Sequence, residues 1–88
     1  MYLLKCNLAE RLYNMEGCMK ITDAKSYGEA IRNRRKELGY TQAYLAEFTG
    51  FSVSFISDLE RGKATAEIGK AIYLANLLGM DLCMEKRG

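Results

Sequence analysis

The pattern of apolar and polar positions is most regular over Gln42–Arg61, where it predicts two short helices. Leu45, Ile56 and Leu59 form an apolar seam at helical spacing. Ala46 is small and lies on the face where a second helix must approach. We therefore expect the two helices to pack against each other over a shared core.

The residues around these two helices carry the signals of helix starts and of a tight turn. The side-chain oxygens of Thr41 and Ser52 can each cap a helix by accepting from an amide of its first turn. Gly50 lies between the helices, where a tight turn needs backbone freedom. Two short helices joined by a turn of about four residues that contains glycine describe a helix-turn-helix, whose second helix lies in the DNA major groove.

The outer face of the second helix separates a DNA-binding motif from an ordinary helical hairpin. At about 100° per residue, Ser54, Ser57, Asp58 and Arg61 cluster opposite the inward side. This face is polar and its side chains are mostly short, so the helix can approach another surface closely. The pattern favours DNA binding over the alternative of a helical pair in a small bundle.

A longer helix is predicted before this motif. Ser26 and Glu29 have the spacing of a capping box, and Gly39 is placed to end the helix. Met19 and Ile21 alternate with polar residues, which permits a very short strand ahead of the helix.

The longer helix carries a charge on its inward side. Ile31, Arg35 and Leu38 are spaced i, i+4, i+7, so Arg35 shares the apolar stripe. Glu60 also lies on the inward side of its helix, about 40° from Ile56. Because a buried charge without a partner is costly, we predict a structural ion pair between Arg35 and Glu60. The alternative is that both side chains extend to solvent.

A fourth helix is predicted over Ala66–Leu78, capped by Thr65 and ended by Gly79. Tyr73 and Leu77 lie nearly opposite its expected core face, and they leave more apolar surface than one monomer needs. An oligomer interface is the commonest reason for such a surface. The expected core face consists of Ile68, Ala71, Ile72, Ala75 and Leu78.

The tail over Met80–Glu85 alternates with a period of two, which predicts a strand. Because a lone strand is unstable, we expect it to pair either with Met19–Thr22 or with the same tail of a second chain. In the second case Leu82 and Met84 join the outer face of the fourth helix in a dimerisation surface.

Length and composition restrict the function further. Eighty-eight residues with a net charge of +2 suffice for one domain with a modest core. There is no histidine and the three cysteines are widely spaced, so we expect no catalytic site, metal site, cofactor or disulfide framework. Reduced thiols and the lack of an apolar run of membrane length predict a cytoplasmic protein without a membrane partner. The basic residues cluster at Arg32, Arg34, Arg35 and Lys36, and at Arg61 and Lys63.

Residues 1–18 are predicted to be an N-terminal extension, and residues 19–88 to be the domain with its C-terminal dimerisation strand. The first segment has loose helical spacing without a cap. Met15-Glu16-Gly17 must be encoded by bases that contain GGARGG, which resembles a bacterial ribosome-binding sequence placed for initiation at Met19. The sequence leaves open whether translation starts at Met1 or at Met19.

The segments IRNRRKELGYTQAYLAEFTG and FSVSFISDLERGK resemble the Xre/Cro-type, lambda-repressor-like helix-turn-helix family, which is similar to about three-quarters of this chain. The resemblance implies an all-α bundle of four to five helices with a short C-terminal β-strand. The continuation GKATAEIGKAIYLANLLGMDLCM is similar to the HipB-like antitoxins in particular. That similarity implies a homodimer, an operator that overlaps the antitoxin's own promoter, and a HipA-like kinase toxin as partner.

The family's contact residues transfer by position onto the two short helices. Gln42 matches a residue that contacts backbone phosphate and braces the second helix, and Arg35 and Glu60 match a buried ion pair. The start of the second helix holds no Gln, Asn, Lys or Arg, so we expect little direct readout and more readout of DNA shape. The resemblance places Ser52, Val53, Ser54, Ser57 and Asp58 at base edges and Arg61, with Lys63 beside it, near phosphate.

We therefore predict a dimeric, sequence-specific DNA-binding repressor that is the antitoxin of a HipBA-like toxin–antitoxin module. Two second helices related by a dimer axis contact half-sites about one helical turn apart, so the operator is expected to be palindromic. One alternative is a phage or mobile-element repressor, which differs in its partner and not in its chemistry. Another is a protein-interaction module that kept the fold without DNA binding.

Overall fold

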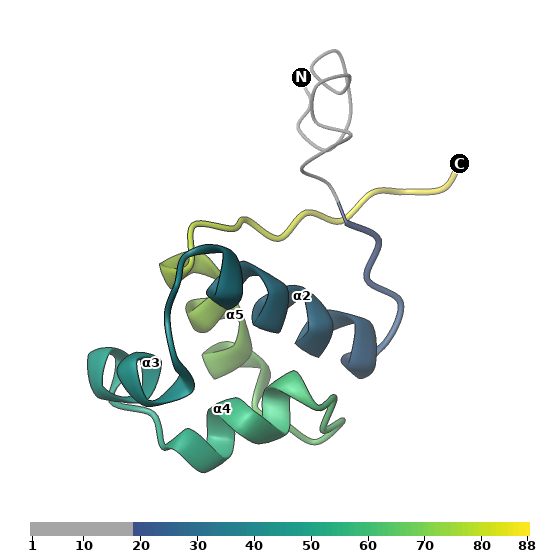
Figure 1. The fold of residues 1–88 in the computed structure, drawn as a ribbon. Helices are drawn as coiled ribbons and strands as arrows, with labels where there is room; N and C mark the ends of the chain where they lie inside the picture. The colour runs from purple at the N-terminus through teal and green to yellow at the C-terminus, as the bar shows by residue number, and fades with distance from the viewer. Residues whose placement is uncertain (1–18) are drawn as a thin grey trace.

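The structure is a computed structural model that describes residues 19–88. Its helices are α2 (Ala24–Glu37), α3 (Gln42–Thr49), α4 (Val53–Glu60) and α5 (Ile68–Leu77). Figure 1 shows α3 and α4 joined by a short turn, with α2 crossing on one side of them and α5 running behind. The all-α fold with its helix-turn-helix is as predicted, whereas the predictions for residues 1–18 lie outside the described residues.

Both predicted caps of the helix-turn-helix are present. The Thr41 side chain accepts from the amide of Tyr44, and the Ser52 side chain accepts from the amide of Phe55, each over 3.0 Å. Gly50 ends α3 with a φ of 83°, in the left-handed region that a side chain disfavours. These local interactions fix where α4 begins and in which direction it leaves the turn.

The core joins all four helices. Its largest fully buried side chains are aliphatic, and burying each one contributes about 1.5–3 kcal/mol. The hydroxyl of Tyr27 in α2 also donates to the carbonyl of Ala71 in α5. The buried cluster consists of Ile31, Leu45, Ile56, Leu59, Ala71, Leu74, Ala75 and Leu78. The helix-turn-helix is therefore held as part of one rigid bundle.

Close backbone contact sets the distance between α2 and α4. Gly28 in α2 is buried, and a Cβ atom at this position would lie 2.3 Å from the carbonyl oxygen of Leu59. Only a residue without a side chain lets the two backbones approach so closely. Gly28 thus places the end of α4 directly against α2.

The predicted start of α2 is wrong. The helix begins at Ala24, because Asp23 is the cap: its carboxylate accepts from the Ser26 amide over 2.8 Å. The Ser26 hydroxyl oxygen accepts in return from the Asp23 amide over 3.1 Å, so Ser26 completes the capping box instead of starting one with Glu29. Hydrogen bonding of the Asp23 carboxylate to Ser26, chiefly to its backbone amide, lowers the pKa of that carboxyl. Leu38, predicted to be inward, is exposed at the end of the helix.

The predictions for α5 also need correction. The helix starts at Ile68, so Thr65 lies too far before it to be its cap. The residue in the capping position is Glu67, and its side chain makes no cap hydrogen bond. Ile68 and Ile72 were expected in the core, but they are 74% and 36% exposed. Leu74 is fully buried in their place. The core face of α5 is therefore rotated relative to the prediction.

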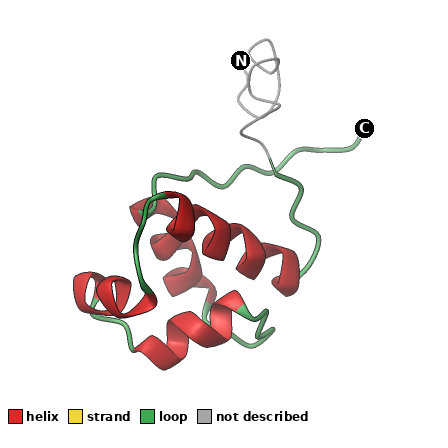
Figure 2. Ribbon diagram, viewed as in Figure 1, coloured by secondary structure: helices red, strands yellow, loops and turns green. Residues whose placement is uncertain are grey.

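The prediction of strands is wrong for the single chain. Figure 2 shows helices joined by loops, and no strand occurs in residues 19–88. Met80 packs partly against the core, whereas Leu82 and Met84 are exposed. Met19–Thr22 does not pair with the tail, and an alternating segment without a partner cannot form a stable strand.

The described helices are short relative to a lipid bilayer. None of those in residues 19–88 combines the length and the apolar character needed to cross a membrane.

Candidate nucleic-acid interface

A buried ion pair fixes α4 to α2. Arg35 donates through Nε to one carboxylate oxygen of Glu60 over 2.7 Å and through Nη2 to the other over 2.9 Å. The two side chains are 9% and 2% exposed. Donating these hydrogen bonds to the Glu60 carboxylate raises the pKa of the Arg35 guanidinium, so the arginine stays charged. The ion pair expected from the helical phases is thus present in the structure.

The same carboxylate ties the start of α3 to α4. Gln42 donates from Nε2 to Glu60 over 3.0 Å, and Arg35 donates from Nη1 to the Tyr40 carbonyl over 2.8 Å. Gln42 is therefore in a position to brace α4, as expected from the resemblance. Three helices converge on this one carboxylate, which leaves α4 a single orientation relative to α2 and α3.

The first turn of α4 is the part of the helix most open to solvent. Ser52, Val53 and Ser54 are exposed, and Val53 shows 44% of its surface although it is apolar. The oxygen of Ser52 is already used to cap the helix. The side chains best placed to contact a base edge are therefore Val53 and Ser54, which offer a small apolar surface and one hydroxyl.

The other end of α4 carries a polar cluster. Arg61 donates to the Ser57 hydroxyl over 2.5 Å and to the Asp58 carboxylate over 2.7 Å. The ammonium of Lys63 lies 3.5 Å from the second oxygen of Asp58. The structure thus brings together all four of the predicted contact residues from this end of the helix, and they contact one another.

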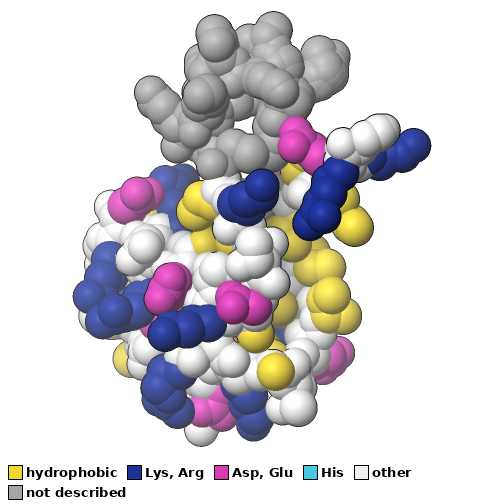
Figure 3. All heavy atoms as spheres, turned by 90° about the vertical axis from the view of Figure 1, so that its right-hand side faces the viewer, with side chains coloured by type: hydrophobic (Ala, Val, Ile, Leu, Met, Phe, Trp, Pro, Cys, Tyr) yellow, Lys and Arg dark blue, Asp and Glu magenta, His cyan; other side chains and the backbone are white. Residues whose placement is uncertain are grey.

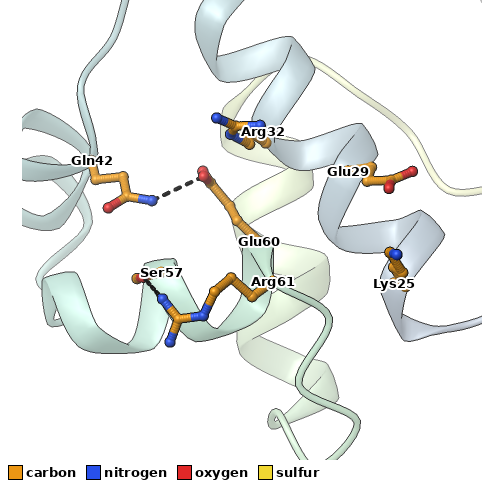
Figure 4. A pocket seen from close by; sticks show the side chains of 7 residues that line it. All are labelled: Lys25, Glu29, Arg32, Gln42, Ser57, Glu60 and Arg61. Carbon is orange, nitrogen blue, oxygen red and sulfur yellow. Dashed lines mark hydrogen bonds between the residues drawn. The ribbon is translucent and has the colours of Figure 1, made fainter.

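An open cleft of about 510 Å³ lies between α2 and the helix-turn-helix. Figure 4 shows its lining, with the Arg61 side chain folded back along α4 towards Ser57. Lys25 and Arg32 contribute positive charge from α2, and Gln42 contributes an amide from α3. The full lining is Lys25, Glu29, Arg32, Gln42, Ser57, Glu60 and Arg61.

From the sequence alone no role is predicted for Lys25, and Arg32 is either a solvated surface charge or a phosphate contact; both residues line this cleft. With Glu29 they are spaced i, i+4, i+7 on one stripe of α2, and this spacing is the signal that could have grouped them. Cations and an amide donor around an open cleft suit an oxyanion such as phosphate. Glu29 opposes such binding, and Glu60 does so less because Arg35 neutralises it.

Comparison with known families decides what kind of protein this is. The model of the family described as Helix-turn-helix matches residues 31–83, which include α3, α4, α5 and the second half of α2. The chain belongs to the helix-turn-helix family. Its match covers the whole ion-pair network and the exposed turn of α4.

Relatives of this helix-turn-helix protein are found in bacteria and in a bacteriophage. An uncharacterized HTH-type transcriptional regulator of Sinorhizobium fredii is 38% identical over 63 residues, which are 72% of this chain and 83% of the relative. A second uncharacterized HTH-type transcriptional regulator, from Haemophilus influenzae, is 33% identical over 64 residues, covering 73% of this chain and 63% of the relative. The ImmF control region 10 kDa protein of Bacillus phage phi105 is 32% identical over 60 residues, covering 68% of this chain and 67% of the relative.

The fold has a solved counterpart in HipB. The structure of a complex of HipB with a 20mer called O4 matches with a TM-score of 0.72 and 20% sequence identity. The match covers 81% of this chain and 100% of the HipB chain. This helix-turn-helix protein therefore has the HipB fold.

Its surface charge is mixed. On the side of the molecule seen in Figure 3, Lys and Arg side chains stand beside Asp and Glu side chains. The sequence as a whole carries 13 basic and 11 acidic residues, so the excess of positive charge is small. Any binding to a polyanion must depend on where the cations are placed, because the net charge provides little attraction.

Proposed function

We propose that this protein is a sequence-specific, DNA-binding transcriptional repressor that places α4 in the major groove. The observation that carries this proposal is the exposed first turn of α4, with Val53 and Ser54 projecting from a helix whose orientation is fixed by buried contacts. A recognition helix needs both features, because base edges can be distinguished only by side chains held in a defined position.

The contacts available to α4 determine how DNA is read. Val53 can pack on a thymine methyl group, and the Ser54 hydroxyl can donate to or accept from a base edge. Lys25, Arg32 and Gln42 line the cleft beside the start of α3, where they can contact backbone phosphate. With so few base contacts, much of the selectivity must come from the shape and deformability of the DNA.

We infer that the repressor acts as a homodimer. Tyr73 of α5 is exposed, Leu77 is partly exposed, and Leu82 and Met84 of the tail are 50% and 98% exposed in the single chain. A second copy can cover these apolar side chains and supply a partner for the alternating tail. The dimer axis then relates two α4 helices, and the operator is a palindrome with half-sites about one helical turn apart.

For the physiological role, the proposal is an antitoxin with a HipA-like kinase toxin as partner. It is supported by the similarity of the C-terminal sequence to HipB-like antitoxins and by the HipB fold. The relative from Bacillus phage phi105 favours a second candidate, a phage-type repressor. The neighbouring open reading frame distinguishes the two: a kinase-like neighbour supports the antitoxin, and neighbouring phage control genes support the phage repressor.

A matched pair of variants tests the assignment of contacts. Val53→Ala is expected to change which sequences are preferred, because it removes a base-edge contact and no charge. Arg32→Ala is expected to weaken binding to all duplexes similarly and to reduce the slope of log K against log salt by about one. Fluorescence anisotropy with several duplexes at two salt concentrations measures both effects. If the two variants behave alike, the assignment of base and phosphate contacts is wrong.

A further inference from the structure

The carboxylate of Asp58 stands between the two cations at the end of α4. One oxygen accepts from Arg61 over 2.7 Å, and the other lies 3.5 Å from the Lys63 ammonium. Both cations are mostly exposed, whereas the Asp58 side chain is about two-thirds covered. Arg61 and Lys63 lie at the end of the recognition helix, where basic side chains are available to contact DNA phosphate.

The backbone holds this arrangement in place. The Lys63 amide donates to the Asp58 carbonyl over 3.0 Å, so the chain turns back on itself directly after the helix. Gly62 makes this turn possible with a φ of 90°. A Cβ atom on Gly62 would lie 2.8 Å from the Cα atom of Lys25, so the turn is also packed against the start of α2. The backbone turn therefore places Lys63 next to Asp58, and their proximity does not depend on side-chain flexibility alone.

This cluster lowers the attraction of α4 for DNA in general. Two cations and one carboxylate leave a local charge of +1, and each cation already has an anionic oxygen as its partner. A DNA phosphate must compete with Asp58 for Arg61 and Lys63, and a carboxylate that loses these partners then faces a polyanion. On a duplex that offers Asp58 nothing in return, the gain from the two phosphate contacts is partly lost.

We propose that Asp58 is a specificity-determining residue that competes with DNA phosphate for Arg61 and Lys63 and releases them when it finds a donor on a base edge. The proposal rests on the proposed DNA-binding function. The cytosine amino group is the donor that a carboxylate recognises in the major groove. Base recognition by Asp58 is thereby coupled to phosphate contacts by its neighbours, which raises affinity for the correct site and suppresses affinity elsewhere.

Asp58→Asn tests this coupling, because the amide keeps the shape and loses the charge. Glu67→Gln is the matched control: it removes the same charge from an exposed pair with Lys70 at the start of α5. The full-length chain and both variants are titrated against a random-sequence duplex and against a duplex selected by the wild-type protein, at salt concentrations from about 50 to 200 mM.

Asp58→Asn is expected to steepen the salt dependence on the random duplex by about 0.9, an additional change in affinity of about 3.5-fold over this salt range. The ratio of selected to random affinity is expected to fall by about tenfold, with loss of preference for cytosine at one position of each half-site. Glu67→Gln should leave the salt dependence and the ratio as in the wild type. An Asp58→Asn variant with the wild-type salt dependence and ratio overturns the inference.

A second test compares the effect of Arg61→Gln in two backgrounds, so it does not depend on the stability of any single variant. Arg61→Gln is expected to change affinity for the random duplex by less than about twofold in the wild type, because Asp58 already neutralises this arginine. In the Asp58→Asn background the same change should lower affinity by several-fold. Equal effects in both backgrounds overturn the inference alone, whereas failure of the wild type to bind any duplex overturns the proposed function with it.

Discussion

Replacing either partner of the Arg35–Glu60 pair by alanine is expected to lower the free energy of unfolding by about 3–5 kcal/mol. Arg35→Ala leaves the Glu60 carboxylate in the interior with Gln42 as its remaining side-chain donor. Glu60→Ala leaves the guanidinium with the Tyr40 carbonyl as its remaining acceptor. In each variant the remaining charge is still buried at its full desolvation cost, but the attraction to its partner that offset this cost is lost.

A surface pair in the same helix provides the matched control. Arg34 and Glu37 lie 3.1 Å apart with side chains 34% and 66% exposed. Because water screens such a pair, Glu37→Ala should cost less than about 1 kcal/mol. A double replacement, Arg35→Met with Glu60→Leu, removes both charges together and should recover much of the stability that each alanine variant loses.

Urea unfolding followed by circular dichroism measures these losses through linear extrapolation. A domain of this size has a total stability of about 4–10 kcal/mol, so a loss of 3–5 kcal/mol is easily resolved. If the two alanine variants lose no more than Glu37→Ala, the pair is solvated and does not fix α4 to α2.

Four other variants test local features. Gly28→Ala is expected to cost about 1–3 kcal/mol, because its Cβ would overlap the Leu59 carbonyl; an unchanged melting temperature would contradict the close contact. Ser52→Ala should cost about 1 kcal/mol in urea unfolding through loss of the α4 cap, and no loss would mean that the cap contributes nothing. Deleting Met80–Gly88 should yield monomers in sedimentation velocity, and a truncated chain that still dimerises at micromolar concentration would place the interface elsewhere. Asp23→Ala should be less stable than the wild type near neutral pH. Because the pKa of the Asp23 carboxyl is lowered in the folded state, this difference in stability is present above about pH 4 and should narrow as the pH falls. A difference that does not depend on pH would refute the charged cap.

The helix-turn-helix could be predicted from sequence because its signals are local. Thr41, Gly50 and Ser52 each act within a few residues of their own position, and the structure shows the caps and the turn that they predict. The Arg35–Glu60 pair connects two distant segments, but helical phase alone turns both side chains inward. Once two opposite charges point into one small core, pairing is the arrangement of lowest cost.

The errors occurred where several local solutions were available. Asp23 and Ser26 can both begin a helix, and the structure uses the carboxylate as the cap and the serine as its partner. The segment of α5 is apolar on several sides, so its spacing could not decide whether Ile72 or Leu74 faces the core. The packing of α5 against the other helices made that choice.

Other features depend on contacts that no local pattern contains. The period-two tail needs a neighbouring strand, which the single chain does not supply. The grouping of Lys25 and Arg32 with Gln42 depends on how closely α2 packs on α4, which Gly28 determines. The pairing of Arg61 with Asp58 changes the expected role of this arginine, since a cation that is already partnered contributes less to non-specific DNA binding than a solitary one.

Selection from a random library of duplexes by the full-length chain tests the central claim most directly. A dimeric repressor with α4 in the major groove predicts an enriched palindrome whose half-sites are about 10 base pairs apart from centre to centre. Repeating the selection with Ser54→Ala should shift the preferred bases within each half-site and leave the spacing unchanged. Recovery of no enriched sequence, with equally weak binding across the library, would contradict the claim and assign the fold to protein interaction instead.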